Sequence, residues 1–171
     1  MMSQSKALFH EEQSFRQIWL LLIIACALLA GPVGVLIEFR SLFGLDPDPA
    51  KWAEFWTKLG ILACVEGIIL VWFLSMKLTT TVKPDGLSLF YRGLYWKDIP
   101  ISLEEVESIE AKEYSPLFQY GGWGVRYVSK GKAYNVFGNQ GVRINYNNGK
   151  HILIGSQDLK KLLKAIQQIQ A

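Results

Sequence analysis

Two long apolar segments near the N-terminus constrain this chain more than any other feature. The first runs from Ile18 to Ile37 without a charged side chain, and the second runs from Leu59 to Met76 with one, Glu66. A helix of roughly 18 or more apolar residues can cross a bilayer. The Leu, Ile and Val residues of the first segment favour insertion by about 4 to 7 kcal/mol, whereas a carboxylate such as Glu66 costs about 2 to 3 kcal/mol. The sequence therefore predicts a transmembrane helical hairpin.

The hairpin divides the 171-residue chain into three parts. Residues 1–16 are predicted to be a polar leader, residues 17–77 the hairpin with spans at about 18–37 and 59–76, and residues 78–171 a domain expected to fold by itself. The second helix is predicted to start ahead of its span, because Asp48 is a good N-cap and Pro49 suits the first helical position. Its early aromatic residues would then lie at the membrane interface.

After Met76 the apolar pattern changes from helical to alternating, which predicts short β-strands. Asn148-Gly149 is a strong hairpin signal between the last two strands. The final segment, from Gln157 to Gln170, is predicted to be an amphipathic helix with Ser156 as its N-cap, covering one open end of the sheets. The predicted strands are Leu78–Val82, Leu87–Tyr91, Leu94–Lys97, a half-exposed strand from Val106 to Glu113, Val125–Val128, Ala133–Phe137, Val142–Tyr146 and His151–Ile154.

This order of short strands followed by one helix resembles the bacterial PH-domain-like membrane proteins, in which two transmembrane helices precede the domain. The likeness covers roughly Leu78 to Ala171 and rests on turn and pairing motifs: Gly86-Leu87, the segment from Gly121 to Tyr127, Gly141 to Ile144, and Gly149 to Gln157. It implies an α+β membrane protein: an N-terminal hairpin plus a PH-like antiparallel β sandwich or barrel capped by a C-terminal helix. Many members of that family have no assigned activity, so the resemblance implies little about function.

Glu66 is the candidate polar site within the membrane. It flanks small residues of the second span, Gly60 and Gly67, and a similar row in the first span includes Gly31 and Gly34, so the two rows are expected to meet. The first span offers no polar side chain at the level of Glu66. Two interpretations stay open: a protonated carboxyl that packs or mediates assembly with another chain, and a role in transport or signalling that requires an oligomer.

Basic and aromatic side chains of the β domain are candidate contacts for lipid headgroups or for a protein partner. Basic residues close to a membrane attract anionic headgroups, and they also act as orientation signals that keep a segment cytoplasmic. Acidic residues lie between them, so the charge is mixed. Trp123 has two interpretations, packing on the sheet or lying near the membrane. The candidate residues are Lys77, Lys83, Arg92, Lys97, Trp123 and Arg126.

The sequence shows no pattern of catalytic, cofactor-binding or metal-binding residues. There are two histidines and two cysteines, both cysteines lie within the apolar segments, and a net charge of +3 is far from that of nucleic-acid-binding proteins. We therefore expect a non-enzymatic, multi-pass protein of the cell (inner or plasma) membrane with a cytoplasmic β domain and both termini cytoplasmic. Its expected function is an interaction or scaffold module that binds a protein partner or lipid headgroups. The alternative is an accessory subunit of an oligomeric transport or signalling complex. Such a complex would assemble through the hairpin, either as a homo-oligomer or with another membrane protein.

Overall fold

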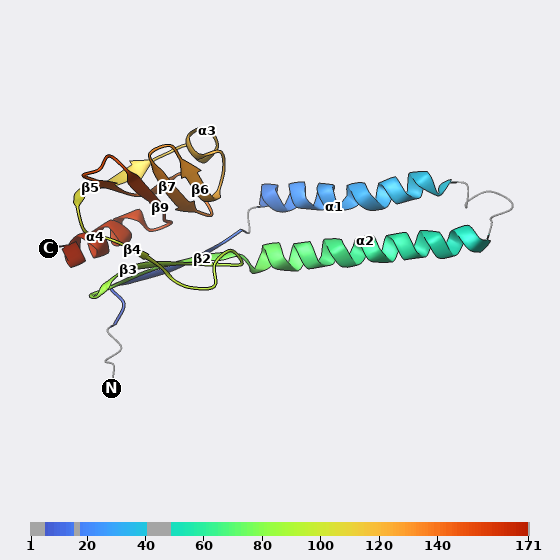
Figure 1. Cartoon of the computed structure of the whole chain (residues 1–171), viewed down its shortest axis with the longest axis horizontal. Helices are drawn as coiled ribbons and strands as arrows, with labels where there is room; N and C mark the ends of the chain where they lie inside the picture. The colour runs from blue at the N-terminus through green and yellow to red at the C-terminus, as the bar shows by residue number, and fades with distance from the viewer. Residues whose placement is uncertain (1–5, 16–17, 41–48, 171) are drawn as a thin grey trace. The chain divides into compact units, whose positions relative to one another are not determined.

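The computed structural model describes residues 6–15, 18–40 and 49–170 (Figure 1). It divides into two compact units. The β unit contains the described residues up to Phe15 together with those from Ser75 onward, and the helical unit contains the residues between them. This differs from the predicted division, because the segment expected to be a separate polar leader belongs to the β unit.

The helical unit consists of α1 (Ile18–Glu38) and α2 (Pro49–Ser75). Both helices are long and apolar enough to cross a membrane, as the sequence predicts. α2 starts at Pro49 as expected, while the predicted N-cap Asp48 lies outside the described residues. Pro32 lies inside α1 and has no N–H, so it cannot donate the helical hydrogen bond to the carbonyl of Leu28.

An aromatic cluster joins the C-terminal end of α1 to the first turns of α2. Phe39 and Phe55 are both buried, and their rings meet edge to face with centroids 5.7 Å apart. Val35, Trp52 and Leu59 pack against this pair. The aromatic residues at the start of α2 therefore pack against α1.

The first sheet of the β unit has four strands in the order β1-β2-β3-β4, each antiparallel to the next. β1 is the segment that sequence analysis places in the leader. Its last residue, Ser14, pairs with Lys77, the first residue of β2, so the helical unit is inserted between two neighbouring strands. A fragment beginning at Leu78 would therefore lack an edge strand. The strands are β1 (Phe9–Ser14), β2 (Lys77–Lys83), β3 (Gly86–Arg92) and β4 (Ile99–Ile101).

The second sheet has five strands in the order β5-β8-β9-β7-β6. The prediction of purely antiparallel strands is wrong for this sheet, because β7 and β9 run parallel. The predicted hairpin at Asn148-Gly149 is confirmed, since β8 and β9 pair antiparallel on either side of it. The elements are β5 (Val106–Glu113), the short helix α3 (Pro116–Tyr120), β6 (Gly124–Val128), β7 (Gly131–Asn135), β8 (Gln140–Tyr146) and β9 (His151–Gly155).

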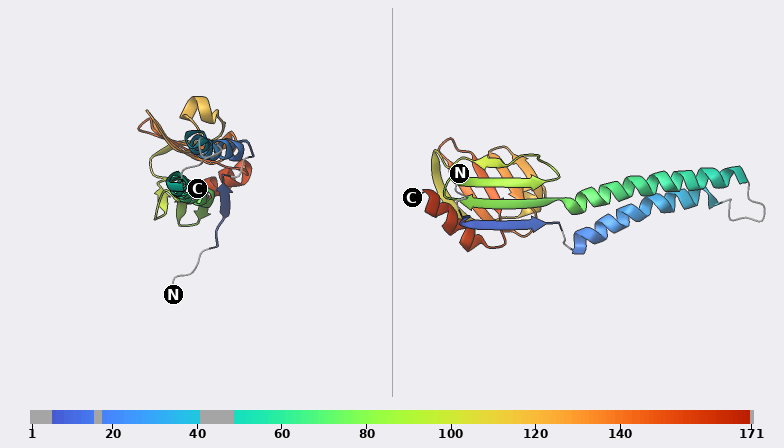
Figure 2. Two further views of the ribbon diagram at one scale, coloured as in Figure 1. Left: turned by 90° about the vertical axis from the view of Figure 1, so that its right-hand side faces the viewer. Right: turned by 90° about the horizontal axis from the view of Figure 1, so that it is seen from below.

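The two sheets form two layers whose strands cross, and α4 (Leu159–Gln170) lies across one open end (Figure 2). α4 contacts strands of both sheets and fully buries Leu162 and Ile166, which confirms that the amphipathic helix covers the core. The sheets do not close into a barrel in the described part of the chain. The structure thus shows an α+β architecture of two apolar helices, two β-sheets and a C-terminal helix.

Two local predictions are wrong. Leu94–Lys97 forms turns and bends, and the short strand of this region is β4. The helix α4 starts at Leu159, and its N-cap is Asp158, whose Oδ1 accepts from the N–H of Lys161. Ser156, the predicted N-cap, instead accepts from the N–H of Asp158.

Candidate functional site

Glu66 lies against α1 inside the helical unit. A Cβ atom added to Gly31 would be 2.8 Å from Glu66 Oε1 and 2.9 Å from Leu62 Cδ2, so these two side chains of α2 cover the gap that Gly31 leaves. Gly31 directly precedes Pro32, where α1 lacks one backbone donor. Glu66 therefore faces α1 next to its proline, where α1 offers no polar side chain.

The predicted meeting of the two rows of glycines is wrong. Cβ atoms added to Gly34, Gly60 and Gly67 would meet no atom within 4 Å, so these glycines do not bring the two helices into close contact. A groove of about 530 Å³ passes Gly31 and Gly34 and ends near the ion pair between Lys58 and Glu38, whose Nζ and Oε1 are 2.6 Å apart.

The structure brings together only some of the predicted basic contacts. Lys77 and Arg92 are register partners at the end of the first sheet where α2 joins β2. The ammonium of Lys77 forms an ion pair with Glu12 (3.1 Å), which holds the pKa of the Glu12 carboxyl below its usual value. Lys83 lies at the opposite end of β2, about 20 Å away at the usual rise of a strand. Lys97 lies in the β3–β4 loop, residues 93–98, which leaves the sheet beside Arg92.

The β3–β4 loop exposes large apolar side chains at this end of the sheet. Trp96 is 100% exposed and Leu94 is 43% exposed. A fully exposed tryptophan is unusual for a side chain of this size. The loop also holds Lys97, so the end of the sheet joined to the helices combines an aromatic ring with basic side chains.

Trp123 and Arg126 lie together at the start of β6. The indole N–H of Trp123 donates to the carbonyl of Gly138 (3.1 Å), and the ring is half-buried. Arg126 is exposed, and its Nη2 lies 3.1 Å from where a Cβ of Gly122 would be. Trp123 therefore fits the packing interpretation, and only Arg126 is directed toward solvent.

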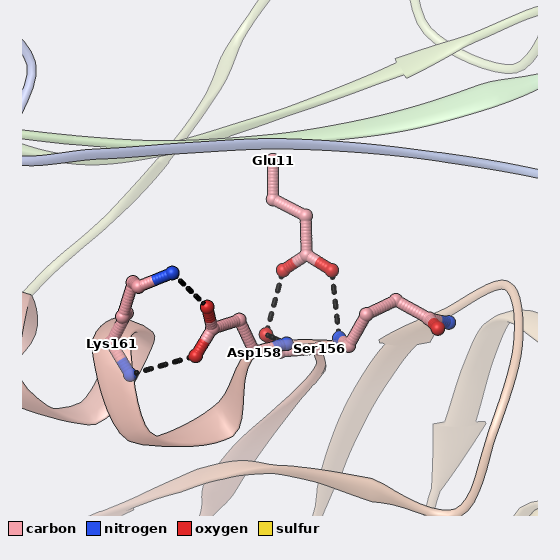
Figure 3. A network of polar contacts seen from close by, with 5 residues as sticks. Glu11, Ser156, Asp158 and Lys161 are labelled. Atoms are coloured by element: carbon pink, nitrogen blue, oxygen red, sulfur yellow. Dashed lines mark hydrogen bonds and ion pairs between the residues drawn. The ribbon is translucent and has the colours of Figure 1, made fainter.

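Sequence analysis missed a polar link between β1 and the start of α4 (Figure 3). Glu11 Oε2 accepts from the hydroxyl of Ser156 (2.6 Å), and Glu11 Oε1 accepts from the backbone N–H of Gln157 (2.7 Å). Gln13 on the same strand donates to the carbonyl of Gly155 (2.8 Å). These bonds attach the strand that precedes the hairpin to the C-terminal helix. The alternating apolar pattern that predicts a strand is absent from β1, because its inward positions Glu11 and Gln13 are polar.

A second polar cluster lies between α3 and the face of the second sheet that carries Ala133 and Leu153. The hydroxyl of Tyr120 lies 3.4 Å from His151 Nε2, and Tyr120 also packs edge to face on Tyr114. His151 Nδ1 and the hydroxyl of Tyr114 are buried without a hydrogen bond to the described residues. Burial, assisted by the nearby Arg143 charge, lowers the pKa of His151, so the imidazole is held neutral.

A cavity of about 690 Å³ lies between β4 and the turns that join β6 to β7 and β8 to β9; we call it the β4 pocket. Its size is that of a small-molecule site. Apolar side chains from both sheets line it together with three tyrosines, and three lysines come from the second sheet and its turns. The residues that matter for its chemistry are Ile99, Ile101, Tyr134, Tyr146, Lys130 and Lys150.

The described residues hold no cluster of three or more His, Cys, Asp or Glu side chains suited to a metal ion. Comparisons with protein-family models, with curated proteins and with solved structures find no match for this chain. The resemblance to bacterial PH-domain-like proteins therefore stays a prediction.

Proposed function

We propose that this chain is a non-enzymatic, membrane-anchored interaction module whose β unit contacts anionic lipid headgroups. The observation that carries the proposal is the fully exposed Trp96 at the end of the first sheet where the helices begin. Ser14 and Lys77 pair there, and only Met76 separates Lys77 from α2. If α1 and α2 cross the bilayer, this end of the sheet is held at its surface.

The chemistry of the β3–β4 loop suits a headgroup layer. Indole rings prefer the membrane interface, because they combine an apolar body with a polar N–H. Arg92 directly precedes this loop, Lys97 belongs to it, and both are exposed; each basic side chain close to an anionic surface contributes about 1 kcal/mol. Lys77 contributes less, since it is already paired with Glu12.

Fluorescence of a labelled loop would test this contact. The full chain, with Cys26→Ser and Cys64→Ser, is placed in nanodiscs, and an environment-sensitive dye is attached to Trp96→Cys. We expect blue-shifted emission that lipid-borne nitroxides quench and that strengthens with anionic lipid. The matched control is Asp85→Cys, in the turn at the opposite end of the same sheet. Equal, unquenched emission from both positions would contradict the proposal.

The same arrangement supports a topology with both termini on one side of the membrane. β1 and β2 pair with each other, so the chain before α1 and the chain after α2 belong to one folded unit. We propose that this side is cytoplasmic, because Lys77, Arg92 and Lys97 follow the second span. A membrane-impermeant thiol reagent should label Ser41→Cys in intact cells and leave Ser129→Cys unlabelled; the reverse pattern would overturn the orientation.

The alternative function is an accessory subunit assembled through the hairpin. The half-buried Glu66 favours it, since a carboxyl near the bilayer centre needs a hydrogen-bond partner. Glu66→Gln keeps a donor and an acceptor and should leave oligomer size unchanged, whereas Glu66→Leu should weaken association. Native mass spectrometry of both variants measures the outcome, and a Glu66→Leu chain that assembles like wild type would remove this alternative.

A further inference from the structure

The β4 pocket combines an apolar floor with basic side chains. We propose that it binds a small organic anion: a carboxylate or phosphate ester with a ring-sized apolar body. The inference is independent of the headgroup contact at Trp96, because the two sites share no residue.

The floor of the pocket is apolar and comes from both sheets. Ile101 of β4 and Tyr134 of β7 are buried, with 5% and 3% of their surface exposed. Ile99 and Ile152 add two half-buried aliphatic side chains. A ligand that binds here must present apolar surface, since pockets of this volume bind ligands mainly through apolar contact.

Lysines supply the charge on one wall. Lys130 and Lys150 belong to neighbouring turns, which are joined by the hydrogen bond from the N–H of His151 to the carbonyl of Lys130 (2.8 Å). Lys132 lies with its ammonium 5.1 Å from the centre of the Tyr127 ring. Within the described part of the chain, none of these three ammonium groups forms an ion pair. An anionic group on the ligand would supply the missing partner.

The segment after β4 forms a further wall of the pocket. Glu104 and Glu105 are exposed there, and their carboxylates would repel an anion, so we expect the anionic group to bind beside the lysine ammonium groups. Glu105 has φ 54°, which is uncommon for a residue other than glycine, and its carbonyl accepts from the N–H of Asn147 (2.9 Å). Tyr146 reinforces the wall by donating to the carbonyl of Ser102 (2.8 Å). The wall is thus fixed before a ligand arrives, which lowers the entropic cost of binding.

The geometry argues against an added peptide strand as the occupant. β4 is an edge strand of three residues, and its central residue is Pro100. Proline has no N–H to donate to a further strand, so this edge cannot pair regularly with a peptide. Recognition in the pocket therefore depends on side chains, as it does for small molecules.

Fluorine NMR of ligand probes would test the proposal with the full chain in nanodiscs of neutral lipid. Two probes are anions, para-(trifluoromethyl)benzoate and para-(trifluoromethyl)phenyl phosphate. Their matched controls are the uncharged para-(trifluoromethyl)benzamide and the cationic para-(trifluoromethyl)benzylamine. We expect line broadening for at least one anion at millimolar concentration, and no broadening for the amide or the amine beyond that of empty nanodiscs.

Three variants locate the binding. The double variant Lys130→Gln, Lys150→Gln should weaken anion binding about tenfold, because each lysine provides a charge-assisted contact. Ser129→Trp should block the pocket from an exposed turn without entering the core. The control, Lys160→Gln with Lys164→Gln, removes two exposed lysines of α4 and should leave binding unchanged.

Each variant must melt like the wild-type protein, so that a loss of binding does not reflect unfolding. Failure of both anions to bind, or equal binding of the amide, would overturn the proposal. Tighter binding of the amine would show that Glu104 and Glu105 recognise a cation instead. Unchanged affinity in the Lys130→Gln, Lys150→Gln variant would show that the anion binds outside the β4 pocket, which would also overturn the proposal.

Discussion

Removal of the Glu11 carboxylate should loosen the C-terminal helix, although Glu11 and its partner Ser156 are 145 positions apart in the sequence. Glu11 accepts two hydrogen bonds at the start of α4, at 2.6 Å from the Ser156 hydroxyl and 2.7 Å from the Gln157 N–H. It also places negative charge at a helix N-terminus, where the helix dipole favours it. The Glu11→Ala variant loses both effects.

The expected loss is about 2 kcal/mol. A hydrogen bond contributes about 1 kcal/mol net, and the larger value of a charged acceptor does not apply to these two bonds, because Glu11 is only half-buried and water can reach the freed groups. For a unit of about 100 residues, this corresponds to a fall of about 10 °C in the melting temperature. Glu11→Gln keeps one acceptor oxygen and should lose about half as much.

Hydrogen exchange measured by mass spectrometry is the most direct assay, because the helical unit does not contribute to it. In the Glu11→Ala chain, peptides that cover Ser156 to Leu162 should exchange faster, while peptides from β8 should change little. The matched control is Glu12→Ala. Glu12 is next in sequence but faces away, and its exposed carboxyl forms an ion pair with Lys77.

Two results would refute this reasoning. A Glu11→Ala chain with wild-type melting and wild-type exchange near Gln157 would show that β1 does not stabilise α4. An equal loss in Glu12→Ala would show that the effect comes from the strand in general and not from the hydrogen bonds of Glu11 to Ser156 and Gln157.

Three further predictions test other parts of the structure. Gly31→Val should destabilise the hairpin by about 1 to 3 kcal/mol, since its side chain would overlap Glu66 and Leu62, and titration with SDS followed by circular dichroism would measure this. Leu162→Asp should cost at least about 3 kcal/mol in the thermal stability of the β unit, because it buries an unpaired charge at a fully buried position. Burial lowers the pKa of His151, so the unfolded chain binds this proton more readily; melting temperature should therefore fall as pH drops through about 6.5, and His151→Gln should flatten that dependence.

The sequence by itself determined the elements whose cause is local. α1 and α2 follow from long apolar segments, whose recognition needs no information about distant residues. The β8–β9 hairpin follows from Asn148-Gly149, because Gly149 adopts a positive φ of 75° at no steric cost. The apolar residues on one face of α4 also lie within one segment, so their burial could be predicted.

The tertiary structure alone decided how distant segments combine. β1 was hidden because Glu11 and Gln13 occupy inward positions where alternation predicts apolar side chains, and they are satisfied only by Ser156, Gln157 and Gly155 at the other end of the chain. The β4 pocket likewise exists only where turns of the second sheet meet β4. Hydrogen bonds between residues far apart in sequence leave no periodic pattern along the chain, so the packing of the two sheets was needed to reveal both the strand and the pocket.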